Sequence, residues 1–281
     1  MRKLIIPAFT ILIILFSSVR GFTADAPMEI HCKHFFHGYP LGTPATNDLI
    51  IRDIYALSNN DTTKFADWVA YRLTVIEVIG YNDQTREWRT DPWLDENETL
   101  DAKPDRKDAY KDANTAIKVD RGHQAPLASF RGSLSWYQTN YYSNITPQKS
   151  ELNQGPWKTL EDTVRAIVKT NKTVYVMTGP LYDKPMADRL PNVTKEYTFP
   201  SGYWKIVCVL DDEDNMDKFQ VAAFIFPQDT PRNAKVLAHL TTIRAIEEKT
   251  KLNFLWELED SIENTVETTD DSAWIKEYIK E

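Results

Sequence analysis

The stretch 119–157 carries three side chains whose types complement one another: Arg121, His123 and Asn153. An imidazole has an unperturbed pKa of about 6.5, so it can accept a proton at neutral pH. An Asn amide offers a neutral oxygen that suits a hard cation such as Mg²⁺, and an Arg offers a planar fork for phosphate oxygens. A proton acceptor, a metal ligand and a phosphate clamp together indicate metal-assisted hydrolysis of a phosphodiester.

The elements around these residues predict how they are positioned. The apolar run 116–119 leads into DRGH at 120–123, so we expect a strand that the chain leaves sharply at Gly122. Asn153 stands at the start of a helical pattern that runs to about residue 169, near the positive end of that helix. The helix has an apolar core face made of Leu160, Val164, Ile167 and Val168.

Several sequence blocks resemble one known family. DRGH at 120–123 is too short to be specific alone, but SNITPQ at 143–148, LNQGPW at 152–157 and LED at 160–162 follow it in order. Together they closely resemble the DNA/RNA non-specific endonucleases of the secreted Serratia nuclease and endonuclease G type. The resemblance extends over nearly the whole chain after the leader, through TTKFADWVAYRL at 62–73, TREWRTDP at 85–92, VYVMTGPLY at 174–182 and GYWKIV at 202–207.

This resemblance implies an α+β fold, with a central antiparallel sheet flanked by helices and a ββα-metal (His-Me finger) core. It implies that His123 is the general base and that Asn153 is the one direct protein ligand of Mg²⁺, which Mn²⁺ could replace. Glu161 lies about 12 Å along the helix from Asn153, at about 1.5 Å per residue, and by resemblance it contacts the waters of the metal. The remaining implied site residues are Arg86 and Arg165 on substrate phosphate, Arg121 as a phosphate contact, and Asn144 as a supporting amide. Asn140 would help to orient His123 through its backbone carbonyl.

Each of these residues also has an ordinary structural interpretation. A lone His is more commonly a satisfied core or surface residue, and Asn is common in turns for local reasons. Arg121 could form a structural ion pair, Arg86 could be a solvated surface cation, and Arg165 could pair with Glu161 one turn away. We interpret Asp120 as structural.

Length, charge and the N-terminus define the class of protein. The 281 residues, less a basic start and an apolar run that resemble a secretory signal peptide over about 1–24, suit a single endonuclease domain over 25–281 with an acidic tail. The apolar run is shorter than the roughly 20 residues that span a bilayer, which favours a signal peptide over an anchor. We therefore expect a secreted or periplasmic protein without stable membrane association, as a monomer or homodimer. The formal net charge of −8 excludes nucleic-acid binding by bulk charge and requires a local basic patch.

The rest of the chain predicts mostly strands. We expect strands at 47–56, 66–79, 174–178, 203–210 and 219–226, a turn at 58–61, a short helix around 107–114 and a helix at 231–251. The segment 257–281 is acidic, and we expect it to be loosely packed.

Two clusters stay open from sequence alone. Cys32 and Cys208 could form a disulfide after export, although nothing in the sequence shows that they meet. HCKHFFH at 31–37 could hold a transition metal, but its spacing matches no standard zinc pattern, so a surface or strand position is the preferred interpretation. Five glycosylation sequons occur, at Asn60, Asn97, Asn144, Asn171 and Asn192.

The predicted function is a sugar-non-specific endonuclease that produces 5′-phosphorylated oligonucleotides from single- and double-stranded DNA and RNA. Two alternatives use the same residues differently: a nucleic-acid-binding protein without catalysis, and a phosphodiesterase for small substrates. The first would need neither His123 nor Asn153, and the second would show no dependence of rate on polymer length.

Overall fold

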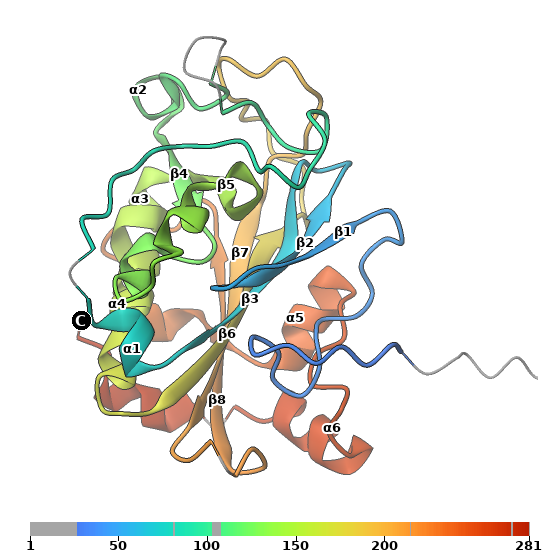
Figure 1. Ribbon diagram of the computed structural model, residues 1–281, viewed down its shortest axis with the longest axis vertical. Coiled ribbons are helices and arrows are strands. Elements are labelled where there is room, and N and C mark those ends of the chain that lie inside the picture. Colours follow the sequence, from blue (N-terminus) through green and yellow to red (C-terminus); the bar gives the residue numbers. More distant parts are fainter. Residues whose placement is uncertain (1–26, 81, 103–107, 214, 271, 281) are drawn as a thin grey trace, which may run out of the picture.

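A seven-stranded antiparallel sheet runs through the middle of the protein (Figure 1). The computed structural model describes residues 27–80, 82–102, 108–213, 215–270 and 272–280, so the expected signal peptide lies outside the described residues. The strands stand in the order β1-β2-β3-β6-β7-β8-β9. Their bounds are Asp48–Ile51 (β1), Ala56–Asn60 (β2), Phe65–Leu73 (β3), Thr173–Leu181 (β6), Gly202–Leu210 (β7), Phe219–Pro227 (β8) and Leu240–Thr241 (β9).

Helices cover both faces of this sheet (Figure 1). One face carries α1 (Val75–Val78) and the continuous helical run of α3 (Ser150–Leu152), a π-type turn (Asn153–Trp157) and α4 (Lys158–Val168). The other face carries α5 (Ile243–Thr250) and α6 (Asp260–Thr268). Because both faces are covered, the central strand β7 is buried along its full length.

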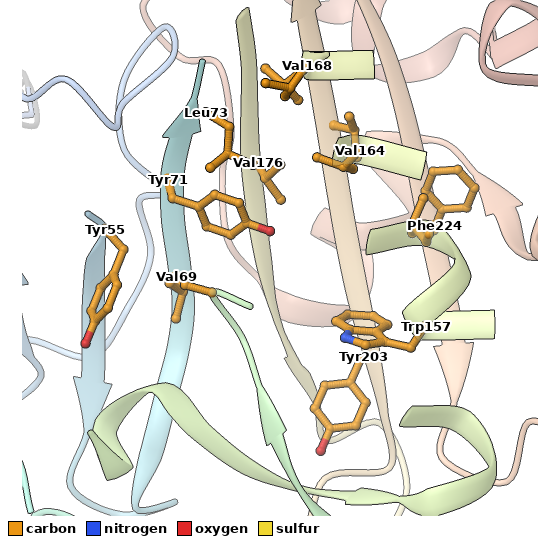
Figure 2. Close-up of a cluster of buried hydrophobic side chains, with 14 of the residues drawn as sticks. Tyr55, Val69, Tyr71, Leu73, Trp157, Val164, Val168, Val176, Tyr203 and Phe224 are labelled. Atoms are coloured by element: carbon orange, nitrogen blue, oxygen red, sulfur yellow. The ribbon is translucent and has the colours of Figure 1, made fainter. Parts of the chain in front are cut away.

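The predicted core face of α4 packs against the sheet (Figure 2). Alternate residues of β7 point to opposite faces, so Tyr203, Val207 and Val209 join the core beneath α4. Trp204, Ile206 and Cys208 join the core beneath α5. The helical stripe read from the sequence therefore matches the observed one, with Leu160, Val164, Ile167 and Val168 all buried.

A separate two-stranded antiparallel sheet stands beside the main one. It pairs β4 (Val119–His123) with β5 (Ile145–Lys149), and Gly122 lies opposite Thr146. A Cβ on Gly122 would come within 2.7 Å of the Gln148 side chain, so only glycine fits there. The connection between the strands contains three 3₁₀ turns, Leu127–Phe130, Trp136–Asn140 and Tyr142–Asn144, and β5 leads directly into α3.

The strands β6, β7 and β8 confirm the sequence prediction with small boundary shifts, but other elements do not. The strand predicted for 66–79 ends at Leu73, because Thr74 and Glu77 form a capping box that starts α1. The segment 58–61 was wrongly predicted as a turn, since it supplies the end of β2. The short helix expected around 107–114 lies later in the chain, since α2 spans Ala113–Ile117, and residue 107 is outside the described residues.

The C-terminal predictions also need correction. The helix expected over 231–251 is confined to α5, since the 3₁₀ turn Val236–His239 and the short strand β9 precede it. The tail is not loosely packed: it forms α6 and a 3₁₀ helix at Ser272–Glu277, in which Ile275 is fully buried. Trp274 donates a hydrogen bond to the carbonyl of Val221 at 3.1 Å, which ties the tail to β8.

The cysteines and the histidine cluster have structural roles. Cys32 and Cys208 are free thiols, so they do not form the disulfide that export would allow. His34 is buried and its Nε2 lies 3.0 Å from the carbonyl of Arg52, while the His37 ring contacts the carbonyl of Met216. Within the described residues, the His cluster is not among the groups whose geometry could hold a metal ion. No helix of the described residues has the length and apolar character needed to cross a membrane.

Candidate active site

A cleft of about 930 Å³ opens beside the β4–β5 sheet and the start of α4. Six of the predicted site residues line it together: Arg86, Arg121, His123, Asn153, Glu161 and Arg165. Its positive charges come from these three arginines with Lys111, Lys158 and Arg232, and its negative charges from Asp112, Asp120 and Glu161. The cleft is thus locally basic in a protein whose formal net charge is −8.

His123 ends β4 in a hydrogen-bonded position. Its Nε2 lies 3.2 Å from the side-chain oxygen of Asn140, whose amide nitrogen donates to the carbonyl of Thr85 at 3.1 Å. Because this second bond turns the amide oxygen toward the imidazole, Nε2 must carry the hydrogen and Nδ1 is left as the proton acceptor. We expected Asn140 to orient His123 through its backbone carbonyl, but the contact is made by the side chain. The backbone carbonyl accepts instead from Arg89.

The surroundings of His123 keep it neutral. Burial lowers the pKa of His123 to about 4, the Asn140 bond opposes this, and the charge of Arg86 lowers it further. The ring also lies 5.4 Å from the ring of Trp88, between centroids. A neutral imidazole at physiological pH can act as a general base.

The Arg86→Gln variant is expected to move the acidic limb of the pH profile of kcat/KM to higher pH. A base works only when deprotonated, so activity is present above the pKa of His123 and is lost as the pH falls through it. Removing the Arg86 charge raises that pKa, although burial still holds it below its usual value. Steady-state rates between pH 3.5 and 7 measure the shift. Arg89→Gln is the matched control, because Arg89 is also exposed but does not line the cleft. If the acidic limb of Arg86→Gln lies at the same pH as that of wild type, the charge of Arg86 does not act on the pKa of His123.

Asn140 and Asn144 lie outside the cleft lining. Asn144 is fully buried, and its amide accepts from the Ala125 backbone at 2.8 Å and donates to the carbonyls of Ala125 and Thr139. It therefore fixes the loop that follows His123 and does not reach a substrate. This burial leaves no room for a glycan on the sequon at Asn144.

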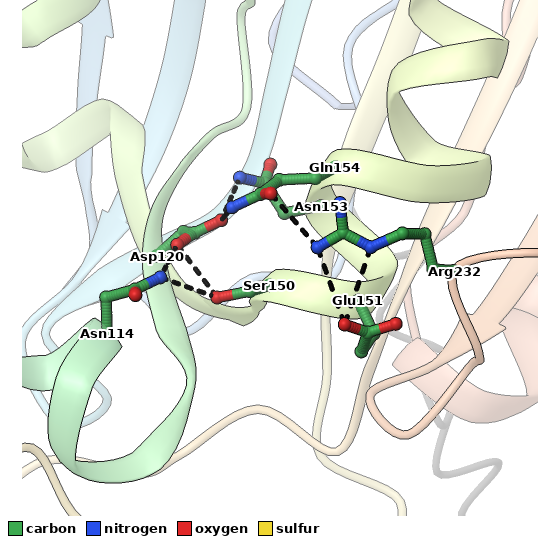
Figure 3. Close-up of polar contacts among 7 residues, drawn as sticks. All are labelled: Asn114, Asp120, Ser150, Glu151, Asn153, Gln154 and Arg232. Carbon is green, nitrogen blue, oxygen red and sulfur yellow. Dashed lines mark hydrogen bonds and ion pairs between the residues drawn. The ribbon is translucent and has the colours of Figure 1, made fainter.

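Asn153 is oriented by a polar network centred on Asp120 (Figure 3). The Asp120 carboxylate accepts from Asn153 at 2.9 Å, from Gln154 at 2.8 Å, from Ser150 at 2.9 Å and from Asn114 at 2.6 Å. Burial alone would raise the pKa of Asp120, but these hydrogen bonds outweigh it and hold the pKa below its usual value. Because the Asn153 nitrogen is engaged, its oxygen is left for another partner, and no described residue donates a hydrogen bond to it.

A local distortion of the helix produces this placement. The turn Asn153–Trp157 is π-type, and Gly155 within it has φ −106° and ψ −117°, outside the helical region. A Cβ on Gly155 would lie 2.5 Å from the carbonyl of Arg232, so the backbones approach closely there. Such π-type turns in α-helices are frequent at functional sites.

The two inner arginines are held by carboxylates. Arg121 pairs with Asp108 at 2.5 Å and donates to the Tyr142 hydroxyl at 3.1 Å, while its guanidinium faces the rings of Trp88 and Tyr110. The structural ion pair considered for Arg121 therefore exists, within the cleft.

Arg165 pairs with Asp162 and not with Glu161, so the pairing considered for it was wrong in its partner. It also donates to the Ser129 hydroxyl at 3.2 Å. Fixed arginines at the wall of a cleft are suited to bind phosphate without a further loss of side-chain freedom.

Comparisons with known proteins give the family of the chain. A family model described as DNA/RNA non-specific endonuclease matches residues 36–261. The chain belongs to the DNA/RNA non-specific endonuclease family. It is 43% identical over 233 residues to a nuclease of Serratia marcescens, a match that covers 82% of this chain and 83% of that protein. It is 32% identical over 147 residues to human mitochondrial endonuclease G, covering 50% of this chain and 45% of that protein.

The fold has a solved counterpart as well. The crystal structure of the EndoG/EndoGI complex contains a chain that aligns with a TM-score of 0.62 at 22% identity. The alignment covers 78% of this chain and 89% of the other. At that identity the likeness concerns the fold, which supports the mixed helix and sheet architecture with a large antiparallel sheet.

One residue beneath the site of this DNA/RNA non-specific endonuclease was missed in the sequence. Lys205 lies on β7 and is fully buried. Its ammonium has no hydrogen-bond partner in the part of the chain that the structure describes, and it lies 4.1 Å from the ring centroid of Trp157. Glu161 follows Trp157 by one helical turn, on the same face of the helix. Burial raises the pKa of Glu161, and the charges of Lys205 and Arg165 oppose this. A Lys inside the apolar run GYWKIVCVL was the signal that could have found it.

The Lys205→Met variant is expected to melt several degrees above wild type at pH 7 yet to need more metal for activity. Burial lowers the pKa of Lys205 to about 8, so below pH 8 the folded state carries the full cost of a buried charge, which Met would remove. Above pH 8 the folded protein loses this proton before the unfolded chain does, so the advantage of Met shrinks toward about pH 10.5. Melting curves at pH 7 and 9.5 and a metal titration measure both effects. In a Glu161→Gln background, Lys205→Met should no longer raise the metal concentration needed for activity. If it still does, Lys205 does not act through Glu161.

Arg232 is a second residue that the sequence did not single out. It lines the cleft and donates to the Gln154 oxygen at 3.0 Å, with Glu151 at 3.4 Å (Figure 3). It comes from the segment after β8, far from the DRGH stretch in sequence. It adds a positive charge beside Gln154, which in turn contacts Asp120.

Proposed function

We propose that this endonuclease hydrolyses internal phosphodiester bonds of DNA and RNA, in single or double strands, and leaves 5′ phosphates. The observation that carries the proposal is the meeting, in one basic cleft, of a neutral imidazole with a free Nδ1 and an Asn amide with a free oxygen. The cations that surround them suit phosphate oxygens, and we propose that they bind the nucleic-acid backbone and not the base edges. Contacts to the backbone position a nucleic acid without reading its sequence.

The residues of the cleft fit a hard divalent cation, with Mg²⁺ as the proposed ion and Mn²⁺ as its replacement. The Asn153 oxygen would be its direct protein ligand, and Glu161 would hold its waters. When bound, the ion would stabilise charge on the bridging oxygens and on the leaving 3′ oxygen. The ionised Asp120 keeps the Asn153 oxygen turned outward by accepting the hydrogen bond from the amide nitrogen.

The protein groups supply the remaining steps. His123 Nδ1 takes the proton of the water that attacks phosphorus in line, and Asn140 holds the imidazole in the tautomer that this requires. Arg121, Arg165 and Arg86 hold the phosphate. The order β4, β5, α3 then corresponds to a ββα-metal core, which we propose as the catalytic unit of a single domain. Secretion or periplasmic location and a monomeric or homodimeric state also stay part of this proposal.

Digestion of plasmid DNA and of a structured RNA by the purified protein tests the function. We expect both polymers to be cleaved with Mg²⁺ and to stay intact with a chelator. Products should be substrates for a 5′-phosphate-dependent exonuclease. Intact polymers in the presence of folded protein and Mg²⁺ would contradict the proposal. Faster cleavage of a dinucleotide than of a polymer, per bond, would instead indicate a phosphodiesterase for small substrates.

A further inference from the structure

Three carboxylates from separate parts of the chain meet away from the cleft, beside the β1–β2 hairpin. Asp48 begins β1, Asp61 follows β2, and Glu98 lies in the segment after residue 90. One oxygen of each lies within 4.8 Å of the others. None of the three residues lines the cleft that contains His123, so this group is distinct from the proposed catalytic site.

The three carboxylates have no ion-pair partner among the described residues. The nearby Lys64 and Lys195 bind the backbone carbonyls of Asn97 and Thr99 on either side of Glu98. Burial raises the pKa of Asp48, and the charges of Asp61 and Asp95 raise it further. Like charges at this separation repel one another, so the arrangement is costly without a partner of opposite sign.

A buried amide provides an independent indication of a ligand. Asn59 is fully buried and stands directly opposite Asp48 in the β1–β2 register, so the two side chains share a face of the sheet. Its nitrogen donates to the backbone carbonyl of Glu98 at 3.1 Å, so the amide lies beside both Asp48 and the backbone of Glu98. No described residue donates a hydrogen bond to its oxygen, and the same holds for one buried oxygen each of Asp48 and Asp61. Three buried acceptors without donors in one place are expensive unless a cation satisfies them.

We propose that Asp48, Asp61, Glu98 and the Asn59 oxygen form a second metal site, for Ca²⁺. The donors are all oxygens, which suits Ca²⁺ or Mg²⁺, and no His or Cys belongs to the group as a zinc site would require. Ca²⁺ takes six to eight oxygens at about 2.3–2.6 Å and accepts several carboxylates in irregular geometry. Mg²⁺ demands a compact octahedron at about 2.0–2.1 Å and prefers one or two carboxylates with several waters. Three carboxylates whose oxygens lie within 4.8 Å of one another, with an amide oxygen beside them, match the larger ion.

The site would join the hairpin to the segment that leads toward the cleft (Figure 1). Two residues of that segment contact Lys195: the carbonyl of Thr99 accepts from its ammonium at 2.9 Å, and Asp101 pairs with it at 2.8 Å. Further along the chain, Asp108 holds Arg121 in the cleft. Bound Ca²⁺ therefore stabilises the folded state and fixes one end of the connection to this arginine.

Thermal melting of the purified protein, stripped with chelator and titrated with CaCl₂ or MgCl₂, tests the site. We expect Ca²⁺ to raise the melting temperature saturably, by about 5–10 °C at a hundredfold excess over Kd. Asp61→Asn and Glu98→Gln should abolish this rise. In chelator, the same variants should melt at or above wild type because they relieve repulsion, and circular dichroism there verifies that they fold. Calorimetric titration with Ca²⁺ should report the site in wild type and its loss in both variants.

Asn153→Ala separates this site from the catalytic one, because it should keep the full response to Ca²⁺. A wild type that does not respond to millimolar Ca²⁺, or variants at Asp61 and Glu98 that respond fully, would overturn the proposal. Loss of the response in Asn153→Ala would assign it to the cleft and overturn it as well. An equal or larger shift with Mg²⁺ would overturn the assignment to Ca²⁺.

Discussion

His123→Ala is expected to lower kcat by about 10²–10⁴, the contribution of a positioned general base, while the protein stays folded. Among the described residues the imidazole has one hydrogen bond, to Asn140, so its loss removes the proton acceptor and leaves the cleft arginines in place. The KM for DNA should change little, because phosphate contacts and not His123 hold the substrate. Initial rates on plasmid DNA and on RNA with saturating Mg²⁺ provide the measurement.

The matched control is His31→Ala. His31 has an exposed side chain whose contact within 4.0 Å is to Glu29, so it should retain full activity on both polymers. Asn140→Ala provides an intermediate case, since it keeps the base and removes the group that sets its tautomer. We expect the kcat of Asn140→Ala to lie between those of His123→Ala and His31→Ala. If folded His123→Ala keeps more than about a tenth of the wild-type kcat, the base must be another group.

The sequence predicted well those elements whose pattern arises locally. The strands β6, β7 and β8 appear as apolar runs because both faces of the sheet are covered, and the helical stripe of α4 has the period of one buried face. The end of β3 could also have been predicted, since Thr74 and Glu77 have the spacing of a capping box. There the strand pattern was extended past a helix signal that the sequence contained.

The misses depend on contacts between distant segments. The tail is acidic in composition, yet Ile275 enters the core and Trp274 reaches β8, which composition cannot indicate. β9 is two residues long and exists because it pairs with β8. Local sequence has no means to specify such a partner.

In the candidate site, too, the sequence predicted residues that belong to local motifs and missed contacts between distant segments. Its residues Arg86, His123, Asn153 and Glu161 could be named because motifs keep them at recognisable positions. The sequence could not show that Asp120 accepts hydrogen bonds from Asn114, Ser150, Asn153 and Gln154. Nor could it show that Lys205 lies on the sheet beneath the helix that carries Glu161. Asp120 was interpreted as structural, and its contacts make it the group that orients Asn153.

Asp120→Asn is therefore expected to raise the Mg²⁺ concentration needed for half-maximal activity by about 10–100-fold, the typical cost of removing a partner that orients a metal ligand. The carboxylate accepts hydrogen bonds from donors on Asn114, Ser150, Asn153 and Gln154. An amide at this position has one acceptor oxygen and brings its own donors into the group, so at least one bond is lost and the Asn153 amide is free to turn. The negative charge near the proposed ion is also removed.

Ser150→Ala separates orientation from charge. It deletes one donor and leaves the Asp120 carboxylate bound to Asn153, so its metal requirement should rise only a few-fold. Activity measured against Mg²⁺ concentration for wild type, Ser150→Ala and Asp120→Asn gives the order of their metal requirements. Because saturating Mg²⁺ restores the ligand by mass action, kcat at saturation should recover in Asp120→Asn far more than in His123→Ala. An unchanged metal requirement in folded Asp120→Asn would mean that Asn153 is positioned by its own backbone, or that the metal is held elsewhere in the cleft.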